Sequence, residues 1–132
     1  RAAIVTAPSF AANHRAQITL TASVTVGVVL RMQSASDASG YLIYLPNSTK
    51  IAVYRITDTG TIALTQLGVD ITITAVTAGD TIGGEITGTT ITILRNGVSQ
   101  GTRTDATYAT GQPGVYIGAS AATVESYAAT DI

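Results

Sequence analysis

The feature that most constrains the fold is a hydrophobic pattern that repeats every second residue. The segment TTITILRNG, residues 89–97, places Ile91 and Ile93 on one face and threonines on the other. A period of two is typical of a β-strand with one buried face. Helical periodicity is nearly absent, and the helix-friendly stretch at residues 10–16 is short. The chain is therefore predicted to be all-β.

The same alternation recurs along the chain. In residues 15–21, Ala16 and Ile18 share one face, and Arg15 and Gln17 share the other. Residues 25–33 are predicted to place Val26, Val28, Leu30 and Met32 inward, with Arg31 on the opposite face. Further strand-like segments are residues 40–46, 49–57, 61–67, 80–88, 114–120 and 122–129.

Turn residues separate these segments. Asn96-Gly97 is the strongest hairpin signal, because both residues tolerate the positive φ of a type I′ turn. Pro46-Asn47-Ser48 is a second turn signal. About ten short strands with turns every 8–12 residues are the pattern of a β-sandwich or barrel. With no linker, low-complexity tail or clear repeat, residues 1–132 are interpreted as one domain.

Gly83 and Gly84 interrupt the strand pattern of residues 80–88. Glycine inside a strand weakens it and usually marks a bulge or a close approach of two chains. A bulge is the predicted explanation. The alternative is a floor without side chains in a ligand groove.

The order of these segments resembles concanavalin A-like, laminin G-like jelly-roll domains. The resemblance rests on VGVVLRMQSASDASGYLIYL, on IAVYRITDTGTIALTQLG, and on the G-D-x-I, I-x-I-x-x-N-G and G-x-P-G-V-Y motifs, and it covers residues 15 to 130. It implies a two-sheet antiparallel jelly-roll β-sandwich. These are packing and turn motifs, and each has a structural explanation. Tyr108, for example, is expected to plug the end of the sandwich with its hydroxyl on the backbone.

Members of that family usually carry an additional N-terminal strand region that pairs with the last strand. The segment RAAIVTAPSF enters after that point. The domain is therefore expected to be a minimal version, to lack its first strands, or to receive them from another segment. Because an unpaired edge invites strand addition, a contact with another protein segment or a second copy is predicted near residues 122–129.

Composition excludes several function classes. The net charge is −1, with seven Lys plus Arg spread along the chain, so no basic face for nucleic acid or for an anionic membrane is expected. No apolar run approaches the roughly 20 residues that span a bilayer. The absence of cysteine excludes disulfides and thiolate chemistry. Charged residues are 11% of the chain, which is low for a cytosolic enzyme.

The sequence gives little support for a catalytic site or a metal site. Glycosidases need two carboxylates flanking the scissile bond, whereas Glu85 and Glu125 are isolated from each other. His14 is the only histidine and is interpreted as a surface residue in a loop. Asp37 and Asp58 are candidates for calcium in loops, but an Asx-turn explains each of them better. No enzyme activity and no cofactor are predicted.

Sugar binding is the remaining chemistry. Sugar rings stack on flat aromatic side chains, and the chain has six tyrosines and no tryptophan. Tyr44, Tyr54, Arg31 and Arg55 fall on adjacent predicted strands, and they are the predicted ligand-binding patch. Tyr41 is predicted to face the other way. The alternative is that each tyrosine merely covers a sheet face or an end of the sandwich.

The predicted function is a non-catalytic, lectin-like module that binds a polysaccharide or glycan. As the resemblance implies, it would belong to a larger secreted or virion protein and be displayed outside a cell or on a virion. The alternative is a structural, assembly or decoration domain of a phage or cell-surface particle, without a sugar site.

Overall fold

The computed structural model describes residues 2–4, 11–118 and 122–132, and within these ranges the chain is all-β, as predicted. In chain order the strands are β1 (Ala2–Ile4), β2 (His14–Leu20), β3 (Val26–Met32), β4 (Gly40–Asn47), β5 (Lys50–Asp58), β6 (Ile62–Gln66), β7 (Ile71–Thr72), β8 (Thr81–Thr87), β9 (Thr90–Arg95), β10 (Val98–Thr104), β11 (Gln112–Ile117) and β12 (Val124–Asp131). The described residues contain no helix that could cross a membrane.

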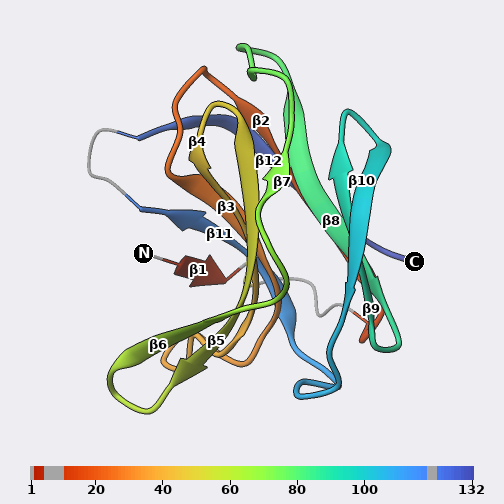
Figure 1. The fold of residues 1–132 in the computed structure, drawn as a ribbon. Coiled ribbons are helices and arrows are strands. Elements are labelled where there is room, and N and C mark those ends of the chain that lie inside the picture. Colours follow the sequence, from red (N-terminus) through yellow and green to blue (C-terminus); the bar gives the residue numbers. More distant parts are fainter. Residues whose placement is uncertain (1, 5–10, 119–121) are drawn as a thin grey trace.

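The strands form two antiparallel sheets that pack face to face (Figure 1). Sheet A has the order β1-β11-β3-β4-β5-β6, and β7 also pairs with β5. Sheet B has the order β10-β9-β8-β2-β12. Chain neighbours such as β8 and β9 form hairpins, whereas β2 pairs with β8 and β12, so the chain passes from one sheet to the other. The predicted two-sheet antiparallel β-sandwich is confirmed.

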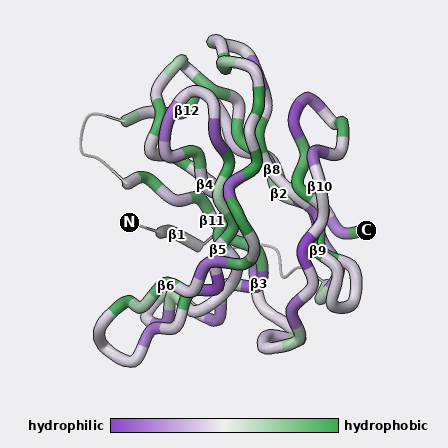
Figure 2. The backbone as a smooth tube through the Cα atoms, in the orientation of Figure 1, coloured by the Kyte–Doolittle hydropathy of each residue, from purple (hydrophilic) through white to green (hydrophobic). Residues whose placement is uncertain are grey.

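One apolar core lies between the sheets. Sheet A contributes side chains such as Val28 and Ile43, and sheet B contributes Ile18, Ile91 and Ile93, all fully buried. Burying each such side chain stabilises the fold by about 1.5–3 kcal/mol. Figure 2 shows hydrophobic, neutral and hydrophilic stretches following one another along the strands.

The predicted turns form where their residues indicated. Asn96 and Gly97 have φ values of 50° and 78° and join β9 to β10. The side-chain oxygen of Asn96 also accepts a hydrogen bond from the N–H of Thr81 at 2.8 Å. Between β4 and β5, Asn47 accepts from the N–H of Thr49 at 2.9 Å.

The bulge predicted at Gly83 and Gly84 is wrong, because β8 pairs with both β2 and β9 without a register shift. The glycines allow close approach instead. A Cβ on Gly84 would overlap the side chain of Ile43 from the facing sheet, and a Cβ on Gly83 would lie 2.8 Å from the Cβ of Gln17.

The alternation breaks near the end of β3. The pairing of β3 with β11 shifts register just before Met32, and Arg31 has a φ of 52°. An extra residue in one strand reverses the faces of the side chains that follow it. Met32 therefore packs with Leu42 and Ile56 on the outer face of sheet A, and the prediction that it faces inward is wrong.

The edges of sheet B differ. The β10 edge carries a register shift between Ser99 and Gly101. At the other edge, β12 pairs with β2, and no further strand of the described chain lies beside it. β1 pairs with β11 in sheet A, not with this last strand. The contact predicted along residues 122–129 stays a prediction.

Candidate functional site

Two predicted site residues, Tyr44 and Tyr54, lie on the outer face of sheet A. Tyr54 pairs with Leu42, so alternation along β4 places both rings on one side. Tyr44 also meets Tyr116 edge to face, with ring centroids 5.4 Å apart and planes at 84°. The rings can meet because Gly27, which lies between them in the register, has no side chain. All three tyrosines are half-buried.

Arg31 does not join these tyrosines, contrary to the prediction. The shift in β3 turns it toward the interior, where it is only 2% exposed. Its guanidinium donates to the carbonyls of Ala12, Gly88 and Tyr108 at 2.7–2.9 Å and to the Asn13 side chain at 3.3 Å. Burial lowers the pKa of Arg31. Through these hydrogen bonds, Arg31 connects several loops of the protein.

Arg55 also lies away from the tyrosines, because it follows Tyr54 in β5 and points to the opposite face. Its Nη1 lies 2.7 Å from Oδ2 of Asp105. Asp105 also accepts from the Tyr41 hydroxyl at 2.7 Å and from the N–H of Thr107 at 2.9 Å. Burial opposes ionisation of Asp105, but these hydrogen bonds outweigh it and lower its pKa to about 2.

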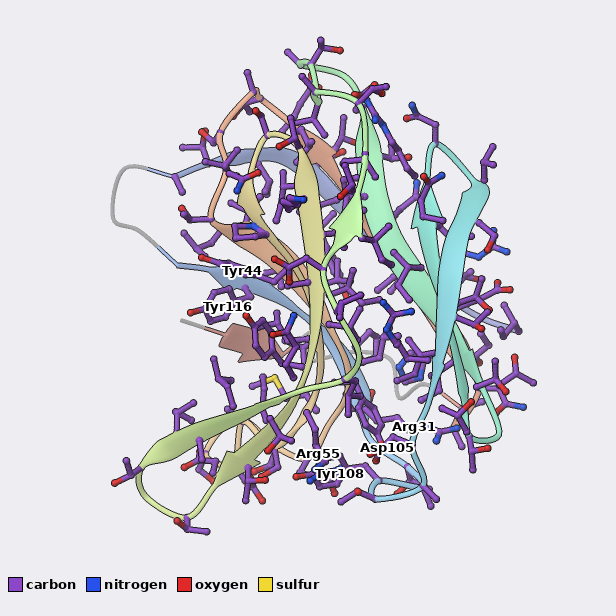
Figure 3. All side chains as sticks on the ribbon, in the orientation of Figure 1. Arg31, Tyr44, Arg55, Asp105, Tyr108 and Tyr116 are labelled. Atoms are coloured by element: carbon purple, nitrogen blue, oxygen red, sulfur yellow. The ribbon has the colours of Figure 1, made fainter. Side chains whose placement is uncertain are left out.

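Tyr108 plugs the end of the sandwich, as predicted. Its hydroxyl donates to the carbonyl of Ile56 at 2.6 Å, and its ring meets that of Tyr41 edge to face at 5.4 Å. Figure 3 shows Tyr108, Asp105 and both arginines together at one end of the sandwich, away from the outer tyrosine pair. We call this group the end network, with members Arg31, Tyr41, Arg55, Asp105 and Tyr108.

A hollow of about 320 Å³ adjoins the end network. It is lined by Ala12, Asn13, Arg31, Gly88, Thr89, Ala106, Tyr108 and Ala109. Small side chains and backbone dominate this lining. Its one charged group, Arg31, already donates four hydrogen bonds to the protein, so this hollow offers little to recognise a ligand.

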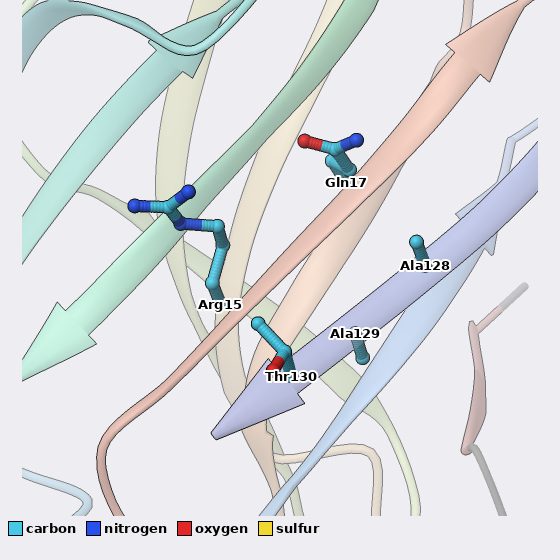
Figure 4. Close-up of a pocket in the computed structure, with 5 residues that line it drawn as sticks. All are labelled: Arg15, Gln17, Ala128, Ala129 and Thr130. Atoms are coloured by element: carbon cyan, nitrogen blue, oxygen red, sulfur yellow. The ribbon is translucent and has the colours of Figure 1, made fainter. Parts of the chain in front are cut away.

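Another hollow, of about 200 Å³, lies on the outer face of sheet B between β2 and β12 (Figure 4). We call it the sheet B hollow, and its lining residues are Arg15, Gln17, Ala128, Ala129 and Thr130. Gln17 pairs with Ala128 and Arg15 pairs with Thr130 across the two strands. The short side chains of β12 leave the space that the longer side chains of β2 border.

Hydrogen-bonding capacity remains at Arg15 and Gln17, which line the sheet B hollow, and at Glu85, which pairs with Arg15 from β8. Arg15 donates through Nε and Nη2 to Oε2 of Glu85, at 3.0 and 2.6 Å. Within the described chain, Nη1 of Arg15, Oε1 of Glu85 and the Gln17 amide have no hydrogen-bond partner. The side chains of Arg15 and Glu85 are 44% and 26% exposed. The ion pair holds both side chains in place while leaving atoms for a ligand.

His14 is not the surface residue that the sequence predicted. It opens β2, faces inward and is fully buried. Nδ1–H donates to the carbonyl of Ala11 at 2.9 Å, and Nε2 accepts from the N–H of Arg31 at 3.2 Å. Burial lowers its pKa, which favours the neutral ring that these two bonds require.

The predicted Asx-turns are confirmed. Asp37 accepts from the N–H of Ser39, and Asp58 accepts from the N–H of Gly60, each at 3.0 Å. Among the residues that the structure describes, no three acidic or histidine side chains gather as metal ligands.

The two glutamates lie on different strands. Glu85 on β8 pairs in the ladder with Arg15 of β2, and Glu125 belongs to β12, on the far side of β2. The carboxylate of Glu85 forms an ion pair with the guanidinium of Arg15 at 2.6 Å.

No protein-family model matches the chain, and no curated protein matches its sequence. Among solved structures, the fold is similar to carbohydrate binding module CBM66 from Bacillus subtilis, with a TM-score of 0.60 and 13% sequence identity. The match covers 99% of this chain and 74% of that module. At this identity the similarity shows a shared β-sandwich fold.

Sequence reasoning missed the sheet B hollow, although part of its signal was visible. Alternation in residues 15–21 already placed Arg15 and Gln17 on the outward face. The partner Glu85 lies 70 residues away, and only the register of β2 with β8 brings it to Arg15. Small residues such as Ala128 give no signal until that packing is known.

Proposed function

We propose that this chain is a non-catalytic carbohydrate-binding module that holds its ligand at the sheet B hollow. One observation carries the proposal. Arg15 and Gln17 line an exposed hollow, and Glu85 lies beside Arg15 on the neighbouring strand β8. Nη1 of Arg15, Oε1 of Glu85 and the amide of Gln17 make no hydrogen bond within the described part of the protein. The sandwich fold that the chain shares with a carbohydrate binding module supports the same class.

The chemistry of these groups suits sugar hydroxyls, each of which can donate and accept. The guanidinium donates, the carboxylate accepts, and the amide of Gln17 does both. Two adjacent hydroxyls can bridge the ion pair, one accepting from Arg15 and one donating to Glu85. Because Glu85 already balances the charge of Arg15, a neutral sugar is favoured over an acidic one.

The outer face of sheet A is a second candidate surface for the same function. Tyr44 and Tyr54, which were predicted to bind a ligand through their aromatic rings, both lie on this face and are half-buried. Part of the Tyr44 ring already contacts Tyr116 edge to face within the protein. Neither of the two predicted arginines lies on this surface, because Arg31 and Arg55 belong to the end network. We therefore place it second.

We further propose that the module belongs to the concanavalin A-like superfamily and serves a larger secreted or virion protein, outside a cell or on a virion. The low fraction of charged residues supports an extracellular setting. The alternative is a structural or assembly domain without a sugar site, which is favoured by the β12 edge of sheet B, where no further strand of the described residues pairs.

Affinity gel electrophoresis tests the proposal with soluble β-glucan, xylan, mannan, dextran and fructan in the gel. At least one polysaccharide should retard the protein, and Gln17→Ala should weaken that binding by about tenfold or more, as expected for losing a polar contact. The matched controls are Tyr44→Ala and Tyr54→Ala, which should bind like the parent protein.

The controls also decide between the two surfaces. Loss of binding with Tyr44→Ala and Tyr54→Ala, but not with Gln17→Ala, would move the site to sheet A. No retardation by any polysaccharide, together with oligomers on a sizing column, would favour the assembly domain.

A further inference from the structure

The sheet B hollow lies at one end of a polar row that crosses the whole outer face of sheet B. Thr130 pairs with Arg15, Arg15 with Glu85, Glu85 with Thr92, and Thr92 with Thr102. Directly paired residues point to the same face of a sheet. Each strand from β12 to β10 therefore contributes one polar side chain to the row.

The row extends over five strands, whereas the hollow lies between two of them. Neighbouring strands lie about 4.7–4.9 Å apart, so four such spacings make the row about 19 Å long. A single sugar ring would occupy the hollow without reaching the rest of the row. A ligand that uses the whole row must be an extended chain of several sugar units.

The far half of the row also has free hydrogen-bonding groups. The hydroxyls of Thr92 and Thr102 make no side-chain hydrogen bond within the described residues. Thr102 is exposed and Thr92 is half-buried. The unused atoms of Arg15 and Glu85 lie between these hydroxyls and the hollow. Free hydrogen-bonding groups thus lie on β2, β8, β9 and β10 of the row, whereas the Thr130 hydroxyl on β12 donates to the carbonyl of Asp131 at 3.3 Å.

The other direction, along β2 and β12, is less regular. It would lead from the hollow toward Thr19 and Ser126, where the pairing of the two strands shifts register between Val124 and Ser126. A shift of register interrupts the even spacing of side chains on a face. The row across the strands has no such interruption between β12 and β9.

We propose that sheet B binds an internal stretch of an extended, neutral glycan that lies across the strands, from the hollow past the Arg15–Glu85 ion pair to Thr92 and Thr102. This inference rests on the proposed function, because it assumes that the hollow holds sugar. It adds the orientation of the ligand and its class: a linear chain bound along its length.

Isothermal titration with oligosaccharides of increasing length tests this inference. The oligosaccharides, from two to six units, are prepared from whichever of the five polysaccharides retards the protein. Affinity should rise with length until the row is filled, at about four units for a row of this length, and then level off. Thr92→Val with Thr102→Val should weaken tetrasaccharide binding about fivefold or more but change disaccharide binding less than about twofold, because only the longer ligand reaches them.

Thr19→Val is the matched control, because it removes a hydroxyl from the same face and keeps a β-branched side chain. Equal affinity for two and six units, still lost with Gln17→Ala, would overturn the extended-chain inference and leave the proposed function intact. A length dependence that Thr19→Val abolishes would overturn the orientation. Absence of binding by every saccharide would overturn both.

Discussion

Arg31 and Arg15 have the same side chain and opposite roles. Arg31 is 2% exposed, and its guanidinium donates hydrogen bonds to three backbone carbonyls and to the side-chain amide of Asn13. The side chain of Arg15 is 44% exposed and keeps Nη1 free beside a hollow. An arginine therefore serves the fold or a binding site according to where its hydrogen bonds go. Variants of the two arginines and their partners test this distinction.

The largest effect is expected for Arg31→Met. Each buried carbonyl left without a donor costs about 1–3 kcal/mol, so the free energy of unfolding should fall by about 3 kcal/mol or more. Urea denaturation at neutral pH measures this change. The matched variant Arg15→Met should lose less than about 1 kcal/mol, as an exposed ion pair does. Similar losses in the two variants would contradict the distinction.

A smaller loss, of about 2 kcal/mol, is expected for Asp105→Asn, because a hydrogen-bonded carboxylate is replaced by an amide. The effect should depend on pH. Asp105 has its pKa lowered from 3.8 to about 2, so its contribution is fully present above pH 4 and is lost as pH falls toward 2. Denaturation curves at several pH values should show a shallower acid slope in the variant. Part of the slope should remain, because hydrogen bonds from Thr77, Arg95 and Asn96 also lower the pKa of Asp80 to about 2.

Glu85→Gln should affect binding more than stability. The change removes the charge that holds Arg15 beside the sheet B hollow. Glycan affinity should fall about tenfold, or 1.4 kcal/mol, while the free energy of unfolding changes by less than about 1 kcal/mol. Titration calorimetry and urea denaturation measure the two quantities. A stability loss without a binding loss would make Glu85 a purely structural residue.

The smallest effect concerns salt. The stability difference between the parent protein and Arg15→Met should disappear in about 1 M NaCl, because salt screens an exposed ion pair. The effect of Arg31→Met should persist, since its partners are carbonyls and an amide inside the protein. Urea denaturation in low and high salt measures the free energy of unfolding of the parent protein, of Arg15→Met and of Arg31→Met. A salt-sensitive Arg31→Met effect would count against its buried role.

The sequence predicted the sandwich because its signals are local. Alternation in β2 and β9, the Asn96-Gly97 turn and the capping role of Tyr108 depend on neighbouring residues or general packing rules. Arg31 was misplaced because the shift in β3 reverses alternation only where β11 pairs with it. Arg55 was predicted to join the tyrosines because it lies on the same strand as Tyr54. As the next residue in that strand, however, it points to the other face of the sheet.

The candidate site could be predicted only in part. The outward positions of Arg15 and Gln17 follow from their own strand. The contact of Arg15 with Glu85, and the row that continues to Thr92 and Thr102, need the registers of several strands distant in sequence. Register is fixed by packing of the whole core, so a local pattern cannot supply it.

The most direct test is an NMR titration of the isotopically labelled protein with a tetrasaccharide prepared from the polysaccharide it binds. The amide shift changes should concentrate on Arg15, Gln17 and residues 128–130, and extend to Thr92. Changes concentrated on Tyr44 and Tyr54 with none at Gln17 would contradict it.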